Sequence, residues 1–299
     1  MSERYPKIRI RAQAGALLAR EGLSFTFYMR HPHGVVADGV RRSLEAFLRA
    51  IGPHALGRYA DEEGEYQKLD DAGWERIHGE LRRAQWGLIR LYDTTPGELR
   101  YRFEYHGRRL VDLLGRDDPN QVSTLSCWLP SEFLEEQGPN RVRELALELA
   151  APLPFCSGYA GLSFNGELDL MGVTREVVKQ CFRYPGMDLC EPRWKLGTRI
   201  QGAQWMTFLG QPVLSELGGA AGLGARLHEP VTAVQELEEE RAVITLGSWP
   251  EAGDTEQGRH LPAYRELARL LEPWLYQESI VDPEFPPEQK RRWERRFLD

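Results

Sequence analysis

The pattern of apolar and polar residues between positions 124 and 165 predicts a strand, a helix and a second strand. Residues 125–129 form a short apolar and aromatic run, and residues 159–164 alternate as a half-buried strand does. Between these runs, after a break at Gly138 and Pro139, apolar residues recur at the spacing of one helix face. The apolar stripe comprises Val142, Leu145, Ala146 and Leu149. This central unit therefore predicts a helix laid across a sheet.

The same criteria predict further elements on either side of this unit. The predicted strands span residues 7–11, 23–29, 86–92, 99–105, 203–209, 233–237 and 241–246, with residues 15–22 connecting the first two. The predicted helices span residues 35–51, 174–182 and 261–276, with another capped at Asp70 and Asp71 and a final basic helix within 286–299. Trp293 and Phe297 are expected to dock this last helix onto the body of the protein.

This order of elements predicts the fold class. Strand, strand and helix follow one another near both ends of the chain, which is typical of an α+β protein. We expect a mostly antiparallel sheet, or sheets, with helices packed on one face. We expect one domain, residues 1–299, and the further hypothesis is that it consists of two related, intimately packed halves at about residues 1–120 and 121–299.

Alternation also predicts which side chains are buried. In residues 99–105 the aromatic side chains are expected on a buried face, and Arg100, Arg102 and Glu104 on a face exposed to solvent. The predicted core includes Trp128, Leu145, Leu149, Phe164, Trp205 and Phe208.

The composition is that of a folded protein without a membrane span. Of the 299 residues, 41% are hydrophobic and 10% aromatic, and no apolar run approaches the roughly 20 residues that cross a bilayer. The first residues lack the layout of a secretory signal, which favours a cytoplasmic location. The formal net charge of -7 argues against general nucleic-acid binding and suits a basic partner. Buried reduced thiols are expected at Cys127, Cys156, Cys181 and Cys190, because they form no C-x-x-C pair.

Three stretches resemble catalytic or binding motifs but lack essential parts. Residues 218–224 space their glycines as G-x-x-G-x-G, the reverse of the dinucleotide fingerprint. Ser163 lacks the second glycine of a nucleophile elbow. His31 and His33 flank a proline, and no further ligand follows at metal-site spacing. We therefore predict no catalytic residue, no metal and no cofactor.

Acidic residues gather at two predicted turns. The first cluster is Asp61, Glu62, Glu63 and Glu65, and the second is Glu236, Glu238, Glu239 and Glu240. Hairpin turns are polar in most proteins, so solvated tips explain both clusters. The alternative hypothesis is that these carboxylates bind a basic partner and, if that partner is a nuclease, occupy the place of nucleic acid.

Seven stretches spread over nearly the whole chain carry a family resemblance. They are residues 59–66 (YADEEGEY), 128–134 (WLPSEFL), 150–155 (AAPLPF), 157–164 (SGYAGLSF), 182–188 (FRYPGMD), 198–210 (TRIQGAQWMTFLG) and 249–254 (WPEAGD). These stretches are similar to the bacterial type VI secretion immunity proteins, once filed as a domain of unknown function. Comparable immunity proteins accompany contact-delivered swarm-inhibition toxins.

The resemblance implies a cytoplasmic, non-enzymatic antitoxin. Such a protein binds and occludes a cognate toxin delivered by a neighbouring bacterium, here expected to be a nuclease. Toxin identity varies within the family, so the resemblance predicts neither the toxin nor its contact surface. Two alternatives stay open at this point: a hydrolase or nuclease whose site is assembled from distant residues, and a small-ligand sensor with an apolar cavity.

Overall fold

The computed structural model describes residues 4–111, 114–168, 170–190, 192–277 and 282–299. Its strands are β1 (Arg9–Arg11), β2 (Leu17–Met29), β3 (Leu56–Ala60), β4 (Tyr66–Lys68), β5 (Gly87–Asp93), β6 (Arg102–Gly107), β7 (Ser123–Pro130), β8 (Ser157–Gly166), β9 (Met206–Leu209), β10 (Thr232–Leu237) and β11 (Arg241–Leu246). Hydrogen-bonded neighbours follow the order β10-β11-β9-β8-β2-β7-β6-β5-β3-β4, and β1 pairs with β2.

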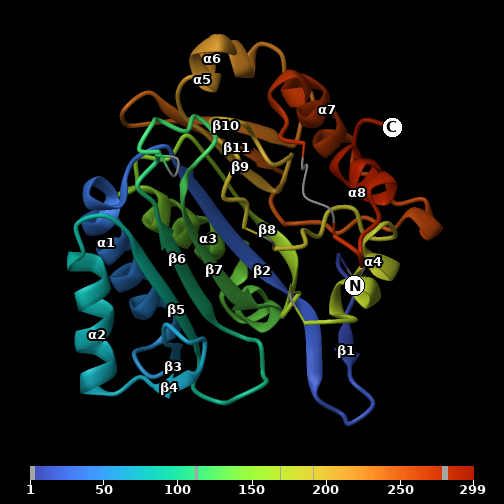
Figure 1. The fold of residues 1–299 in the computed structure, drawn as a ribbon. Helices are drawn as coiled ribbons and strands as arrows, with labels where there is room; N and C mark the ends of the chain where they lie inside the picture. The colour runs from blue at the N-terminus through green and yellow to red at the C-terminus, as the bar shows by residue number, and fades with distance from the viewer. Residues whose placement is uncertain (1–3, 112–113, 169, 191, 278–281) are drawn as a thin grey trace. The chain divides into compact units, whose positions relative to one another are not determined.

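Helices account for most of the remaining regular structure (Figure 1). They are α1 (His33–Ile51), α2 (Asp71–Arg82), α3 (Ser131–Ala150), α4 (Val173–Cys181), α5 (Val213–Glu216), α6 (Gly219–Gly224), α7 (Pro262–Leu271) and α8 (Pro287–Glu294), with short 3-10 turns η1 (Thr255–Gln257) and η2 (Glu272–Trp274). An antiparallel sheet with helices packed onto it confirms the predicted α+β class. No helix within the described ranges is both long enough and apolar enough to cross a membrane.

The chain divides into two compact units. Unit 1 comprises Met1–Ser24, Ser157–Glu191 and Arg199–Asp299, and unit 2 comprises Phe25–Cys156 and Pro192–Thr198. Strand β2 contributes residues 17–24 to unit 1 and residues 25–29 to unit 2.

In unit 2 the helices cover one face of the sheet. Figure 1 shows α1 and α3 behind strands β5, β6 and β7. Phe47 of α1 lies 6.0 Å from Phe103 of β6 between ring centroids, which places the apolar stripe of the helix on the apolar face of the strand. Helix α3 has the predicted break, because Gly138 adopts φ 77° ahead of Pro139. The predicted strand, helix and second strand around α3 are confirmed as β7, α3 and β8.

In unit 1 the C-terminal segment docks as predicted, although its helix α8 ends at Glu294 and does not extend to Asp299. Trp293 and Phe297 are 3% and 4% exposed, and Phe297 packs 5.4 Å from Tyr264 of α7. Helix α7 ends at Leu271 instead of Tyr276, because Pro273 cannot continue the hydrogen-bond ladder of the helix.

The predicted core is confirmed. Trp128 is 5% exposed, and the other five residues are completely buried. All four cysteines are buried free thiols, as expected.

At two strands a charged side chain explains why the observed boundary differs from the predicted one. Strand β2 begins at Leu17, inside the predicted connection at residues 15–22. Its Glu21 breaks the apolar pattern but is fully buried, where it accepts hydrogen bonds from the backbone N–H of Ile8 (2.8 Å) and from the guanidinium of Arg9. This pairing satisfies a charge that would otherwise keep the segment in solvent.

The second wrong boundary lies in the hairpin of β5 and β6. Strand β6 begins at Arg102, not at Leu99, whose φ is 51°. The carboxylate of Asp93 accepts the backbone N–H groups of Arg100 and Tyr101, both at 2.8 Å. A side chain thus takes the place of strand pairing for these residues.

Candidate partner surface

The two faces of the sheet in unit 2 differ in what covers them. The helix side carries completely buried side chains: Ile89, Leu91, Phe103, Tyr105, Leu125 and Cys127. On the opposite side, Figure 1 shows no helix of unit 2 in front of β5, β6 and β7. We call this side the open sheet face and define it by Arg90, Tyr92, Arg102, Glu104, His106 and Trp128.

Strand register brings these side chains together. Arg102 lies opposite Tyr92 on one side and Trp128 on the other, and Glu104 lies opposite Arg90. Side chains directly opposite each other on one face are in contact distance. The open sheet face therefore alternates cationic, aromatic and acidic groups at close range.

Glu104 is the charge that holds this face together. Its carboxylate lies 2.8 Å from the guanidinium of Arg102 and 2.6 Å from Nε2 of His106. Burial alone would raise the pKa of Glu104, but the charge of Arg102, the hydrogen bond and charge of His106 and the charge of Arg90 together lower it to about 2. The predicted exposure of Arg102 and Glu104 is wrong, since their side chains are only 14% and 12% exposed.

Guanidinium groups cover the aromatic rings of this face. The guanidinium of Arg102 lies 5.0 Å from the ring of Tyr92 and 4.7 Å from that of Trp128. The ring of Tyr66 meets Tyr92 edge-on at 4.9 Å, and Arg58 lies 5.0 Å from Tyr66. This stacking keeps long side chains in few rotamers and extends the face from β7 to β4.

Trp194 adds an exposed aromatic group to unit 2. Its segment is tied to the chain before β7, because the Trp194 carbonyl accepts the N–H of Val122 at 3.3 Å. The indole packs 5.2 Å from the ring of His106, and the guanidinium of Arg108 lies 5.2 Å from it. Trp194 is nevertheless 48% exposed and Tyr66 is 52% exposed, so both present aromatic surface to solvent.

The first acidic turn connects β3 and β4 in unit 2. Asp61 shapes the turn by accepting the N–H groups of Glu63 (3.1 Å) and Glu65 (2.9 Å). The side-chain amide of Gln67 and these two N–H groups hold the pKa of Asp61 below its ordinary value. The Asp61 carbonyl accepts a hydrogen bond from Arg90 at 3.2 Å, which attaches the turn to the open sheet face.

Glu62 differs from its neighbours in this turn. It lies 3.3 Å from Arg76 and 2.9 Å from Arg83, so its charge is already paired. Glu63 and Glu65 are exposed and form no ion pair among the described residues. These two carboxylates are therefore the ones available to a partner.

The second acidic turn connects β10 and β11 in unit 1. Glu239 and Glu240 have φ values of 57° and 53°, a conformation that costs a non-glycine residue on the order of 1 kcal/mol. Arg241 lies 3.5 Å from Glu239, and Gln211 donates to the carbonyl of Glu240 at 3.2 Å. Glu236 and Glu238 are exposed and lack ion pairs within the described ranges.

Most of the residues that resembled catalytic groups in the sequence are buried. His33 is buried, and its Nδ1 lies 2.9 Å from the hydroxyl of Tyr105, whereas His31 is exposed. Ser163 is buried and donates to Oδ1 of Asn165 at 2.6 Å. Burial raises the pKa of Cys181 to about 12, which keeps its thiol protonated and weakly nucleophilic. Within residues 218–224, Gly219–Gly224 form the short helix α6 after a left-handed Gly218.

The open sheet face was missed by sequence reasoning. The alternation of Arg102, Glu104 and His106 was visible, but it predicts a solvent-exposed face in most hairpins. The signal that could have found the face is the recurrence of tyrosine and tryptophan on the polar side of neighbouring strands, at Tyr92 and Trp128.

Replacing Glu104 by glutamine should remove a pH-dependent part of the stability. The folded-state pKa of about 2 lies below the ordinary 4.5, so this group stabilises the fold above about pH 5, and the stabilisation is lost as the pH falls toward 2. The full effect is about 3 kcal/mol, with about 2 kcal/mol of it lost by pH 3. Urea unfolding at pH 6 and pH 3 should show this loss in the parent protein and not in Glu104→Gln.

Glu144→Gln is the control, because Glu144 is an exposed carboxylate on α3. It should keep the parental loss of stability between pH 6 and pH 3. An equal loss in Glu104→Gln would contradict the assigned role of Glu104.

Comparisons with known proteins agree with this fold. A family model described as type VI immunity for VRR-NUC matches residues 39–297. Among solved structures, the Pseudomonas aeruginosa T6SS protein PA0821 is similar, with a TM-score of 0.78 and 21% identity over 99% of this chain and 88% of that chain. This second likeness shows a shared fold, and no curated protein sequence matches the chain. Because the family model covers most of its length, this protein belongs to the family of type VI immunity proteins for VRR-NUC.

Proposed function

We propose that this protein protects a bacterium by binding a nuclease toxin and blocking its active site, without catalysing a reaction. The match of residues 39–297 to an immunity family for VRR-NUC carries the proposal. A nuclease acts on nucleic acid, so the antidote is needed in the cytoplasm, where bacterial nucleic acid lies. The net charge of -7 favours association with a basic nucleic-acid-binding protein.

Protection by binding predicts a fixed stoichiometry. Titrating the purified protein against the nuclease encoded beside it should abolish DNA cleavage at about one molecule per toxin, because each bound molecule blocks one active site. Cleavage followed by gel or fluorescence measures this endpoint. Complete inhibition at a small fraction of one equivalent would indicate an enzymatic antidote instead.

We infer that the open sheet face and the adjoining first acidic turn form the toxin-binding surface. Binding hot spots are enriched in tryptophan, tyrosine and arginine, and at the margin of this face Tyr66 and Trp194 are exposed. Tyr66 and Trp194 are exposed aromatic anchors held by guanidinium stacking. Glu63 and Glu65 place negative charge in the turn that leads into Tyr66, where a nuclease's phosphate-binding groups can meet it.

Charge reversal distinguishes the two acidic turns. Glu63→Lys with Glu65→Lys should slow toxin association severalfold at low salt, because it removes steering charge without breaking the ion pairs of Glu62. The difference from the parent protein should shrink as salt is raised. Stopped-flow or surface-based kinetics across a salt series measures the effect.

Glu236→Lys with Glu238→Lys is the matched variant on the second acidic turn. It makes the same change in net charge at residues that also lack ion pairs in the part of the chain that the structure describes. Its association rate should stay closer to the parental rate. If the two double variants slow association equally, only the net charge matters and the first turn is not part of the interface.

Truncating the aromatic anchors should accelerate toxin dissociation. Trp194→Ala and Tyr66→Ala each should weaken binding by about 2 kcal/mol if the rings are covered by the toxin, mainly through the dissociation rate. Val35→Ala serves as a control, because Val35 is also an exposed apolar residue (61%) but lies in α1, on the helix side of the sheet. Parental dissociation rates for Trp194→Ala and Tyr66→Ala would place the interface elsewhere.

A further inference from the structure

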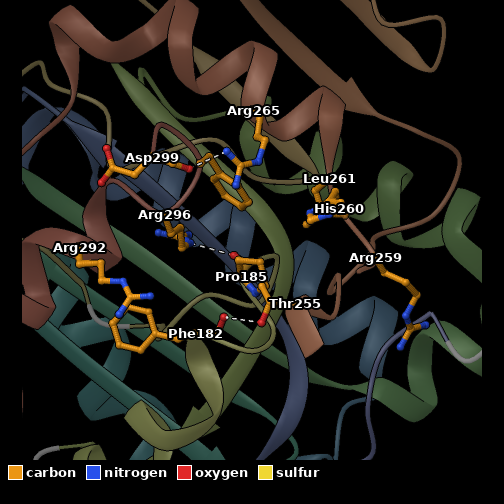
Figure 2. Close-up of a pocket in the computed structure, with 11 residues that line it drawn as sticks. Phe182, Pro185, Thr255, Arg259, His260, Leu261, Arg265, Arg292, Arg296 and Asp299 are labelled. Atoms are coloured by element: carbon orange, nitrogen blue, oxygen red, sulfur yellow. Dashed lines mark hydrogen bonds between the residues drawn. The ribbon is translucent and has the colours of Figure 1, made fainter. Parts of the chain in front are cut away.

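Unit 1 contains a cavity of about 220 Å³ that is lined mainly by cationic and aromatic side chains. Figure 2 shows Arg265 from α7, Arg292 from α8 and Arg296 from the turn after α8 along one part of it. Phe182, at the end of α4, lies beneath Arg292. A cationic concavity stands out in a protein whose net charge is -7.

Two of these arginines pair with no Asp or Glu side chain among the described residues. Arg265 donates to a main-chain oxygen of Asp299, the last residue of the sequence, at 2.7 Å. The guanidinium of Arg292 lies 5.0 Å from the ring of Phe182 and is otherwise exposed. The Asp299 side chain also reaches the lining, but it lies 3.4 Å from Arg295, so its charge is shared outside the cavity.

Arg296 is a buried cation held in a fixed position. Its side chain is 7% exposed, and burial lowers its pKa. It donates to the carbonyls of Pro185 (2.8 Å) and Trp293 (3.1 Å), and its guanidinium stacks 3.9 Å from the Trp293 ring. Its nearest carboxylate, Asp188, is 3.8 Å away. Arginine has five N–H donors, so this arrangement fixes the group without saturating it.

Arg259 plays a different part. In Figure 2 its guanidinium points away from the other three arginines. It lies 3.5 Å from Asp254, a carboxylate that already accepts two hydrogen bonds from Arg183 at 3.1 and 3.0 Å. The anion-binding part of the cavity is therefore formed by Arg265, Arg292 and Arg296.

We propose that this cavity binds a small phosphate-bearing anion. Guanidinium groups bind phosphate oxygens through pairs of N–H donors, and several of them around one concavity suit an anion with more than two oxygens. The volume is below that of sites for drug-sized molecules, which favours inorganic phosphate or the terminal phosphate of a nucleotide. This site is separate from toxin binding, so its failure would leave the proposed immunity function standing.

Calorimetric titration tests the proposal with three probes: inorganic phosphate, AMP and adenosine, in chloride buffer at constant ionic strength. Phosphate or AMP should bind, and adenosine should not. Arg265→Gln with Arg292→Gln should weaken this binding at least about tenfold, because two charged donors are lost. Binding of phosphate identifies a free-anion site, whereas binding of AMP alone identifies a nucleotide site.

The matched control is Arg269→Gln with Arg291→Gln, which removes two exposed arginines of the same helices that do not line the cavity. It should bind the anion as the parent does. Absence of binding by both phosphate and AMP, equal binding of adenosine, or equal weakening in both double variants would overturn the proposal. Arg292→Gln alone changes an exposed residue and provides the same comparison with Arg291→Gln if the first double variant does not fold.

Discussion

Glu104 has to balance two arginines and a histidine on a sheet face that no described helix of unit 2 covers. Removing one partner from a mostly buried ion pair leaves an uncompensated charge, which is far more destabilising than an unpaired charge in solvent. The short contacts to Arg102 and His106 and the depressed pKa of Glu104 all follow from this requirement. Because the charges neutralise one another, the face can remain uncovered by helices and still be fixed in shape.

A fixed surface is what inhibition by occlusion needs. Binding that orders long side chains loses part of its free energy to lost rotamer freedom. On the open sheet face this ordering exists before a partner arrives, since Arg102 is held between two rings and Arg108 rests on a third. In the proposed interface the acidic turn adds long-range attraction at the edge of the same face, to which Arg90 attaches it. In this proposal, electrostatic attraction and a surface of fixed shape thus come from adjacent parts of unit 2.

The sequence predicted those features that depend on local pattern. The spacing of apolar residues was sufficient to predict α1, the central strand, helix and strand, and the buried core. Burial of one face of an element places apolar residues at regular intervals along the sequence. The local pattern predicted the wrong strand boundaries near Glu21 and Asp93. At both positions the carboxylate accepts hydrogen bonds within the fold, so a charged residue there does not indicate a loop or an exposed strand end. Both errors shifted boundaries and left the fold class intact.

The candidate sites were less predictable, because they join residues distant in the chain. The two acidic turns are visible in the sequence as runs of carboxylates. That Glu62 is ion-paired and Glu63 is not depends on arginines in α2 and just after it, which only the fold brings close to Glu62. Trp194 packs against the ring of His106, which lies 88 positions earlier in the chain, and no spacing rule predicts such a contact. The arginines of the unit 1 cavity likewise come from separate helices and turns.

In unit 2 the residues that support the fold differ from those exposed at its margin, and this difference affects how new toxin and antitoxin pairs can arise. Arg102 and Glu104 support the fold, whereas the exposed rings of Tyr66 and Trp194 lie at its margin and support little of the core. In the proposed interface, substitutions at this margin alter which partner is accepted while the scaffold keeps its stability. Recognition in such a protein can drift through a few peripheral positions, so lineages that share this architecture can diverge in the toxins that they neutralise.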